Sequence, residues 1–343
     1  MPTDEEEVSL KKEKEKSGKG RLGKFASYYK PHRKLFFIDM ACALIVSVCT
    51  LVYPAIAGKI VRSGETSVVL TGCGVLLAVF LLKAALNYVI AYWGHVVGVR
   101  IQGDMRSELF AHLQKLPFTY YDETKVGSIM SRLVNDLFEV SELAHHGPED
   151  LFLSVLTFIG AEVMIAFIDP WLALIVLAVI PVIVIVAVKL RLQLLSAFKV
   201  SRERTSEINA TVESSVSGIR VAKSYTAEKH EHEKFESANK GLKDARSLQY
   251  RAMSNFQTAM SFSLDFLYLV ALLSGGLFYA FGKLDASGLT SYVLYIAMLI
   301  TPIRTFITIF EQLQEGMTGF DRFLEVLAVA PEKEPLSPVK VGV

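Results

Sequence analysis

The sequence is poor in the residues that build covalently linked scaffolds. It has 3 cysteines among 343 residues. Cys42, Cys49 and Cys73 each lie inside an apolar stretch, and their spacing fits neither a disulfide framework in an exposed loop nor a metal site. We interpret them as packing residues, and we predict that this chain binds no metal ion and no cofactor.

The sequence also lacks a phosphate-binding loop of the form Gly-x-x-x-x-Gly-Lys-Ser/Thr. The Gly-Lys pairs that begin at Gly23, Gly58 and Gly282 are followed by Phe, Ile and Leu, where the loop requires a hydroxyl. That hydroxyl holds Mg²⁺, and the backbone and the lysine hold the phosphates of ATP. We therefore predict that this chain alone is not an enzyme and contains no catalytic residues.

Apolar residues, in contrast, are abundant. They make up 52% of the sequence, and the mean hydropathy of +0.38 exceeds what a soluble domain needs. Six apolar runs are long enough to cross about 30 Å of hydrocarbon at roughly 1.5 Å per residue. They cover residues 35–58, 66–99, 151–168, 171–188, 252–282 and 286–310. The sequence predicts an all-α membrane protein with six transmembrane helices.

The connections between these runs are strongly asymmetric. Two long polar loops, 100–150 and 189–251, contrast with the short connection at Asp169 and Pro170. Most Lys and Arg residues lie before the first run or in the two long loops. By the positive-inside rule, both loops and both termini are cytoplasmic. We expect a multi-pass protein of the plasma membrane.

The two ends of the chain differ in composition from the rest. Residues 1–20 mix Glu, Lys, Gly and Ser and cannot bury apolar surface, so we predict a disordered, charged N-terminus. Apolar residues recur at helical spacing among Arg and Lys between Arg21 and Lys34, which fits either a short helix in the membrane interface or an ordinary basic flank. We expect residues 332–343 to form a linker to a further domain.

Both long loops read as pairs of helices. Apolar residues recur with helical spacing as far as Leu116, where Pro117 ends the helix, and a second helix follows Gly127. The second loop repeats this plan, with a bend near Gly218. Asp122 is placed to cap a short helix at the first bend, and Gly127 allows the chain to turn back.

The two bends carry specific motifs. LPFTYYDETKVGSIMSRLVND (116–136) resembles the first intracellular loop of ATP-binding cassette (ABC) exporters, and GIRVAKSYTAEKHEHEKFESAN (218–239) is similar to the second. GFDRFLEVLAVAPEKEP (319–335) resembles the segment that leads into the ATPase of that family. The resemblance covers residues 21–331 and implies the transmembrane domain of an ABC exporter.

The resemblance also implies partners. Each bend would be a coupling helix that docks on a nucleotide-binding domain, which is absent here and would hold ATP and Mg²⁺. Two six-span subunits would form a domain-swapped homodimer or heterodimer in the lipid bilayer, with no role for nucleic acid. The alternative is that the bends merely close two helical hairpins. The expected coupling residues are Tyr120, Tyr121, Asp122, Glu123, Thr124, Val126, Gly127, Ser224, Tyr225, Ala227 and Glu228.

Several residues inside the spans are candidates for a substrate pathway. Charges at Lys83, Glu162 and Asp265 are costly in hydrocarbon, so they line a cavity, pair with one another, or reach the membrane surface. Tyr295, Met298 and Phe306 could contact an apolar substrate, although such residues at helical spacing more often pack in a core.

Two histidine groups have side chains that could bind a metal ion. One is His145 and His146 beside acidic residues, and the other is His230 and His232 in the run His-Glu-His-Glu. Runs of this kind are usually solvated helix faces. We therefore do not count them as a metal site.

These observations predict the transmembrane half of an ATP-driven exporter. It would form the substrate pathway and transmit ATPase movements through the two bends, so that the pathway opens alternately to each side. Two other readings fit the same residues: an importer of a small ligand on this fold, and a membrane scaffold that works without an ATPase. The sequence does not distinguish lipid, drug and peptide as cargo.

Overall fold

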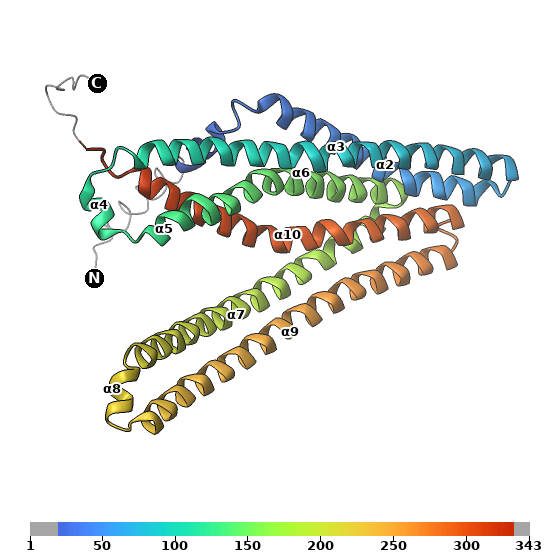
Figure 1. Ribbon diagram of the computed structural model, residues 1–343. Coiled ribbons are helices and arrows are strands. Elements are labelled where there is room, and N and C mark those ends of the chain that lie inside the picture. Colours follow the sequence, from blue (N-terminus) through green and yellow to red (C-terminus); the bar gives the residue numbers. More distant parts are fainter. Residues whose placement is uncertain (1–19, 333–343) are drawn as a thin grey trace, which may run out of the picture. The chain divides into compact units, whose positions relative to one another are not determined.

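The computed structural model describes residues 20–332, and this part of the chain is helical almost throughout (Figure 1). Residues 20–27 form a short helix. The elements that follow are α2 (Arg33–Ser63), α3 (Thr66–Leu113), α4 (Phe118–Glu123), α5 (Val126–Ser131), the π-helix η1 (Arg132–Asp136), α6 (Leu137–Ile168), α7 (Pro170–Ser217), α8 (Ile219–Ser224), α9 (Glu228–Ala280) and α10 (Ala286–Leu327). The predictions for residues 1–19 and 333–343 lie outside the described residues.

The predicted number of transmembrane helices is confirmed. Six helical segments are long and apolar enough to cross a membrane. They are Arg33–Ser63, Thr66–Leu113, Val126–Ile168, Pro170–Ser217, Glu228–Ala280 and Ala286–Leu327. Each includes one of the six predicted spans apart from the last residues of the fifth, so the hydrophobic runs identified the helices correctly.

Short connections join consecutive helices where the sequence predicts them. Helix α2 ends at Gly64, whose φ of 62° is a left-handed conformation that glycine adopts without steric cost. Helix α7 begins directly after Asp169, whose carboxylate accepts a hydrogen bond from the backbone N–H of Trp171 at 2.8 Å. This cap, with Pro170 in the first turn, fixes the start of α7.

The described part of the chain divides into two compact units, residues 20–164 with 286–332, and residues 165–285. In the first unit, α10 packs on α2. Ser291 donates a hydrogen bond to the carbonyl of Pro54 at 2.9 Å, and the hydroxyl of Tyr295 donates to the carbonyl of Leu51 at 2.9 Å. Side-chain hydroxyls therefore join these two helices inside the apolar region.

Helices α3 and α6 approach each other closely in the first unit. Gly94 and Gly98 are four residues apart on α3, and a Cβ at Gly98 would lie 2.9 Å from Oγ of Ser141 on α6. Pairs of small residues at this spacing let helix backbones come together in membranes. The contact places the N-terminal part of α6 against α3.

A well-buried cluster joins the ends of several elements outside the predicted spans. It contains Tyr28, Met105, Leu109, Val140 and Phe320, among others. The cluster therefore connects the N-terminal segment with α3, α6 and the C-terminal part of α10.

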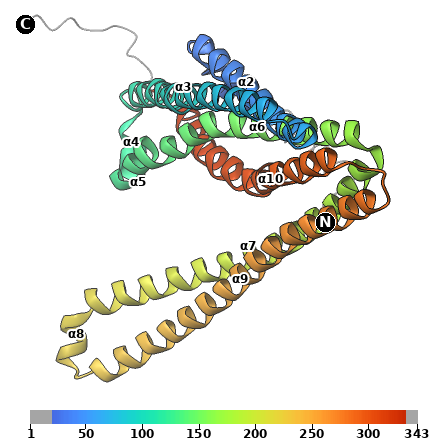
Figure 2. The same ribbon diagram turned by 90° about the vertical axis from the view of Figure 1, so that its right-hand side faces the viewer.

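The second unit consists of α7 and α9, which pack along each other and are joined by α8 (Figure 2). Helix α9 has 53 residues and would be about 80 Å long at 1.5 Å per residue. Both helices continue well past their predicted spans. The prediction of a second long helical hairpin with a bend at Gly218 is confirmed.

Candidate coupling sites and polar clusters

The first tip, residues 118–131, is a pair of short helices. Helix α3 ends at Leu113, three residues before the predicted end, because residues 114–116 form a turn before Pro117. Helix α4 then runs to Glu123, Thr124 and Lys125 are extended, and α5 begins at Val126. The tip therefore consists of two six-residue helices joined by the two extended residues Thr124 and Lys125.

Two details predicted for the first tip are wrong. Asp122 lies at the end of α4 and caps no helix; the residue before α4 is Pro117, and no side chain caps it. Gly127 lies inside α5, and its φ is not positive. The reversal occurs at Thr124 and Lys125, whose extended conformations are open to any residue and require no glycine.

The aromatic residues of the first tip differ in exposure. Tyr120 packs against the buried cluster around Leu109, and the hydroxyl of Tyr121 donates a hydrogen bond to the carbonyl of Leu113. Phe118 is 82% exposed and Val126 is 73% exposed. The two tyrosines therefore attach the tip to its own unit, while Phe118 and Val126 face outward. Phe118 was missed as a site residue, although the Leu-Pro-Phe motif contains it.

The other residues predicted for the first tip are mostly exposed. Asp122, Glu123 and Gly127 are exposed, and Thr124 is half-buried. The structure brings all seven residues predicted for the first tip together within 118–131. Whether they contact an ATPase remains a prediction.

The π-helix η1 follows the first tip and packs against α10. Asp136 is buried, and one oxygen of its carboxylate lies 3.1 Å from a guanidinium nitrogen of Arg322. A Cβ at Gly319 would lie 2.6 Å from the backbone oxygen of Asp136. This contact positions the start of α6 against the end of α10, and its residues were not predicted as a site.

The second tip, residues 218–228, contains α8 and the turn after it. Tyr225 is 81% exposed, and Thr226 has a positive φ of 52°. The hydroxyl of Ser224 donates to the carbonyl of Arg220 at 2.8 Å, and the N–H of Ala227 donates to the carbonyl of Ala222 at 2.8 Å. Backbone bonds therefore hold Tyr225 outward, just before α9 begins at Glu228.

The candidate charged residues of the pathway are divided between the two units. Lys83 and Glu162 belong to the first unit, and no ion pair joins them within the described part of the chain. Asp265 is exposed and belongs to the second unit. The role of these three residues remains a prediction.

The three pathway candidates on α10 are partly or fully buried by neighbouring side chains. Tyr295 is buried and bonded to the carbonyl of Leu51. Phe306 meets Phe158 edge to face, with ring centroids 5.9 Å apart. Met298 is half-buried. Of these three, Met298 and Phe306 retain some exposed surface for a ligand.

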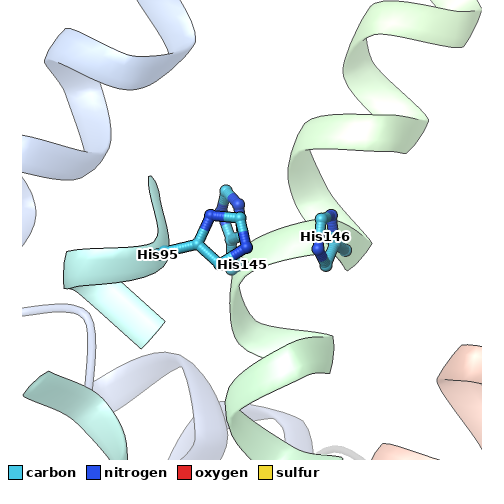
Figure 3. Close-up of side chains that lie close together, drawn as sticks. All are labelled: His95, His145 and His146. Carbon is cyan, nitrogen blue, oxygen red and sulfur yellow. The ribbon is translucent and has the colours of Figure 1, made fainter. Parts of the chain in front are cut away.

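Histidines from two helices meet near the predicted membrane boundary (Figure 3). His95 of α3 lies beside His145 and His146 of α6. The ring centroids of His95 and His145 are 4.4 Å apart, and those of His145 and His146 are also 4.4 Å apart. His230 and His232, in contrast, are exposed at the start of α9. The sequence showed only the neighbouring pair, because His95 lies on another helix.

The helices thus define a polytopic membrane protein with six spanning helices and two helical extensions that end in compact tips. Residues 35–303 match the ABC transporter transmembrane region. The chain belongs to this family. The resemblance read from the two tip motifs is therefore confirmed at the level of the family.

Relatives show how much of a longer protein this chain corresponds to. The uncharacterized ABC transporter ATP-binding protein YwjA of Bacillus subtilis is 34% identical over 91% of this chain and 55% of that protein. YfiC of the same organism, with the same description, is 28% identical over 97% of this chain and 56% of its own length. An ATP-dependent lipid A-core flippase of Syntrophus aciditrophicus is 22% identical over 88% of this chain and 51% of that protein. The chain therefore spans about half the length of these relatives.

Proposed function

We propose that this chain is the transmembrane half of an ATP-driven exporter, and that its two tips transmit the movements of a nucleotide-binding domain to the substrate pathway. The observation that carries the proposal is the outward placement of large apolar residues at both tips. Phe118 and Tyr225 are each more than 80% exposed, and both lie outside the predicted spans. Exposed aromatic residues on compact, well-supported elements are typical centres of protein interfaces.

The structural support behind each tip fits a coupling role. The first tip is attached through Tyr120 and Tyr121 to a buried cluster, and the second closes two helices that pack along their length. A force applied at either tip would therefore move whole helices rather than bend a loop. Both tips would then face the cytoplasm, as the distribution of Lys and Arg predicts.

The names of the relatives support the partner and the cargo class. YwjA and YfiC are described as ATP-binding proteins, and this chain covers about half of each. The flippase relative moves a lipid by its name. A nucleotide-binding domain holding ATP and Mg²⁺, in the same gene or a separate chain, is therefore the proposed partner, and an apolar or amphipathic molecule is the proposed cargo class.

The division of the chain supports exchange of helices between two subunits. Helices α7 and α9 form a compact unit of their own. A unit of this kind can pack on a second copy of the chain. We propose a dimer in which this unit contacts the neighbouring subunit in the plasma membrane.

The experiment uses the transporter together with its nucleotide-binding domain, in inverted membrane vesicles. Phe118→Ala and Tyr225→Ala remove the proposed docking side chains. Phe110→Ala on α3 and Tyr250→Ala on α9 are matched controls, because they remove exposed aromatic residues away from the tips. The measured quantities are ATP hydrolysis and ATP-dependent accumulation of fluorescent phospholipids and lipophilic dyes.

Loss of an interface centre costs about 2 kcal/mol or more, which corresponds to roughly thirtyfold weaker docking. Both tip variants should therefore lose most of their ATP-dependent accumulation, while the controls keep it. Wild-type accumulation in both tip variants would show that the tips do not couple hydrolysis to transport. Accumulation in right-side-out vesicles alone would assign the importer reading instead.

A further inference from the structure

We propose that His95, His145 and His146 form a binding site for a divalent transition-metal ion of the Zn²⁺ type, placed between α3 and α6. One nitrogen from each ring lies within 4.8 Å of the others, on two helices whose backbones are in close contact. Imidazole nitrogen is a preferred ligand of Zn²⁺. This proposal stands apart from the proposed transport function.

A backbone carbonyl determines which ring nitrogen of neutral His95 carries the proton. Its Nδ1 lies 2.6 Å from the carbonyl oxygen of Ala91. A carbonyl can only accept a hydrogen bond, so in the neutral ring Nδ1 carries the proton and Nε2 has a free lone pair. Metal-binding histidines usually donate their second ring N–H to a carbonyl or carboxylate in this way. His95 therefore presents a ligand nitrogen without further adjustment of its proton.

Acidic side chains surround the other two rings. Nε2 of His146 lies 3.7 Å from Glu142, and its Nδ1 lies 3.7 Å from Asp150. Nδ1 of His145 lies 3.2 Å from Oε2 of Glu149. These carboxyl groups place oxygen atoms close to the rings, where a bound cation would favour their ionised form.

Two of the carboxylates near His145 have oxygens without a hydrogen-bond partner. Asp39 is 3% exposed and Glu149 is 7% exposed. Oδ1 of Asp39 is buried and makes no hydrogen bond, and the buried Oε2 of Glu149 has only its ion-pair contact with Nδ1 of His145. Together with His145 they form a second group whose ligand atoms lie within 4.8 Å of one another. Buried oxygens of this kind are costly unless a donor or a cation satisfies them.

The backbone of α3 fixes the central ring. A Cβ at Gly94 would lie 2.0 Å from Cε1 and 2.5 Å from Nδ1 of His145. The ring therefore rests in the notch that this glycine leaves, directly beside His95. A ring held by packing loses little conformational freedom when it binds a metal.

The spacing of the ligand atoms suits closure around an ion. Zn²⁺ binds nitrogen at about 2.0–2.1 Å, which places two ligand nitrogens of a tetrahedral site roughly 3.3 Å apart. The rings would close by small side-chain rotations, since His95 is exposed and His146 is half-buried. Asp39, Glu149 or a water molecule would complete the coordination. The bound ion would link α3 to α6.

The experiment measures metal binding directly in the purified full chain, in detergent micelles, after the affinity tag has been removed and the metal stripped with a chelator. Zn²⁺ is titrated by calorimetry and by elemental analysis after desalting. Co²⁺ is added separately, because its ligand-field absorption reports nitrogen ligands. The variants are His95→Ala and His146→Ala, and the control is the double variant His230→Ala with His232→Ala on α9, which removes exposed histidines elsewhere.

The wild type and the control should bind one Zn²⁺ per chain, and His95→Ala and His146→Ala should weaken binding at least tenfold and remove the Co²⁺ absorption. His95 is exposed, so its variant keeps the packing of His145 and tests the site without loss of folding. Size-exclusion elution and helical circular dichroism verify that folding. The proposal is overturned if the wild type binds no Zn²⁺, if binding persists in the His95→Ala and His146→Ala double variant, or if only the control variant loses it.

Discussion

The imidazole ring of His145 fills the space that a side chain at position 94 would need, because a Cβ on Gly94 would lie 2.0 Å from Cε1 of the ring. The histidine comes from α6 and the glycine from α3. The contact therefore makes the approach of these two helices depend on the absence of a single methyl group.

Gly94→Ala should destabilise the chain. The added methyl group must displace a buried ring, and overpacking of this kind costs about 1–3 kcal/mol. Thermal unfolding of the purified chain in detergent measures the effect. Gly103→Ala is the matched control on the same helix, because nothing lies within 4 Å of its Cβ. At position 103 alanine favours the helix more than glycine does, so this variant should be more stable by up to about 1 kcal/mol. Equal stability of the two variants would contradict the close contact.

Arg322→Ala should destabilise the contact between α10 and η1. Asp136 has a side chain that is 10% exposed, and it would lose its ion-pair partner at 3.1 Å. The arginine is about half exposed, which limits the effect to about 1 kcal/mol. Arg132→Ala is the comparison, since its pairing atom on Glu325 is 3.5 Å away and Glu325 is mostly exposed. The free energy of unfolding measured in urea should fall clearly for Arg322→Ala only. A larger fall for Arg132→Ala would show that the ion pair with Glu325 stabilises this contact more than the ion pair with Asp136.

Tyr28 should make the chain sensitive to alkaline pH. Burial raises the pKa of its phenol above the ordinary value of about 10, and the hydrogen bond to Glu108 raises this pKa further. Above pH 10 the unfolded chain releases this proton while the folded chain keeps it, so the free energy of unfolding falls as the pH rises. Below pH 10 Tyr28 is protonated in both states, so it does not change how the free energy of unfolding depends on pH.

Tyr28→Phe removes this titration. Its free energy of unfolding should therefore fall less steeply above pH 10, by up to about 1.4 kcal/mol per pH unit. Chemical unfolding of both proteins at pH 8 and at pH 10.5 to 11 gives the comparison. An identical slope in the two proteins would mean that the phenol titrates alike in the folded and unfolded chains.

Much of the architecture follows from the sequence because membrane spans require long apolar runs and the short connections carry strong local signals. Asp169 and Pro170 are an example, since their local chemistry alone defines the start of α7. The end of α3 was placed three residues too late, because the apolar pattern continues through Leu116 although the backbone leaves the helix after Leu113.

The details of the first tip required the structure. Asp122 and Gly127 carry typical cap and turn chemistry, yet the backbone reverses at Thr124 and Lys125 through conformations that leave no sequence signal. The meeting of His95 with His145 likewise depends on which faces of two distant helices pack together. Local patterns do not contain that information.

The hydroxyl of Tyr121 should stabilise the first tip independently of any partner. It donates a hydrogen bond to the carbonyl of Leu113, which lies at the end of α3 where carbonyls lack helical partners. Tyr121→Phe should lower the local stability of the tip by about 1 kcal/mol. In the full-length protein, the amides of residues 118–124 should therefore exchange with deuterium roughly fivefold faster. Tyr225→Phe is the control, because Tyr225 is exposed, and exchange at the second tip should stay unchanged. Wild-type exchange in Tyr121→Phe would show that this bond does not hold the tip.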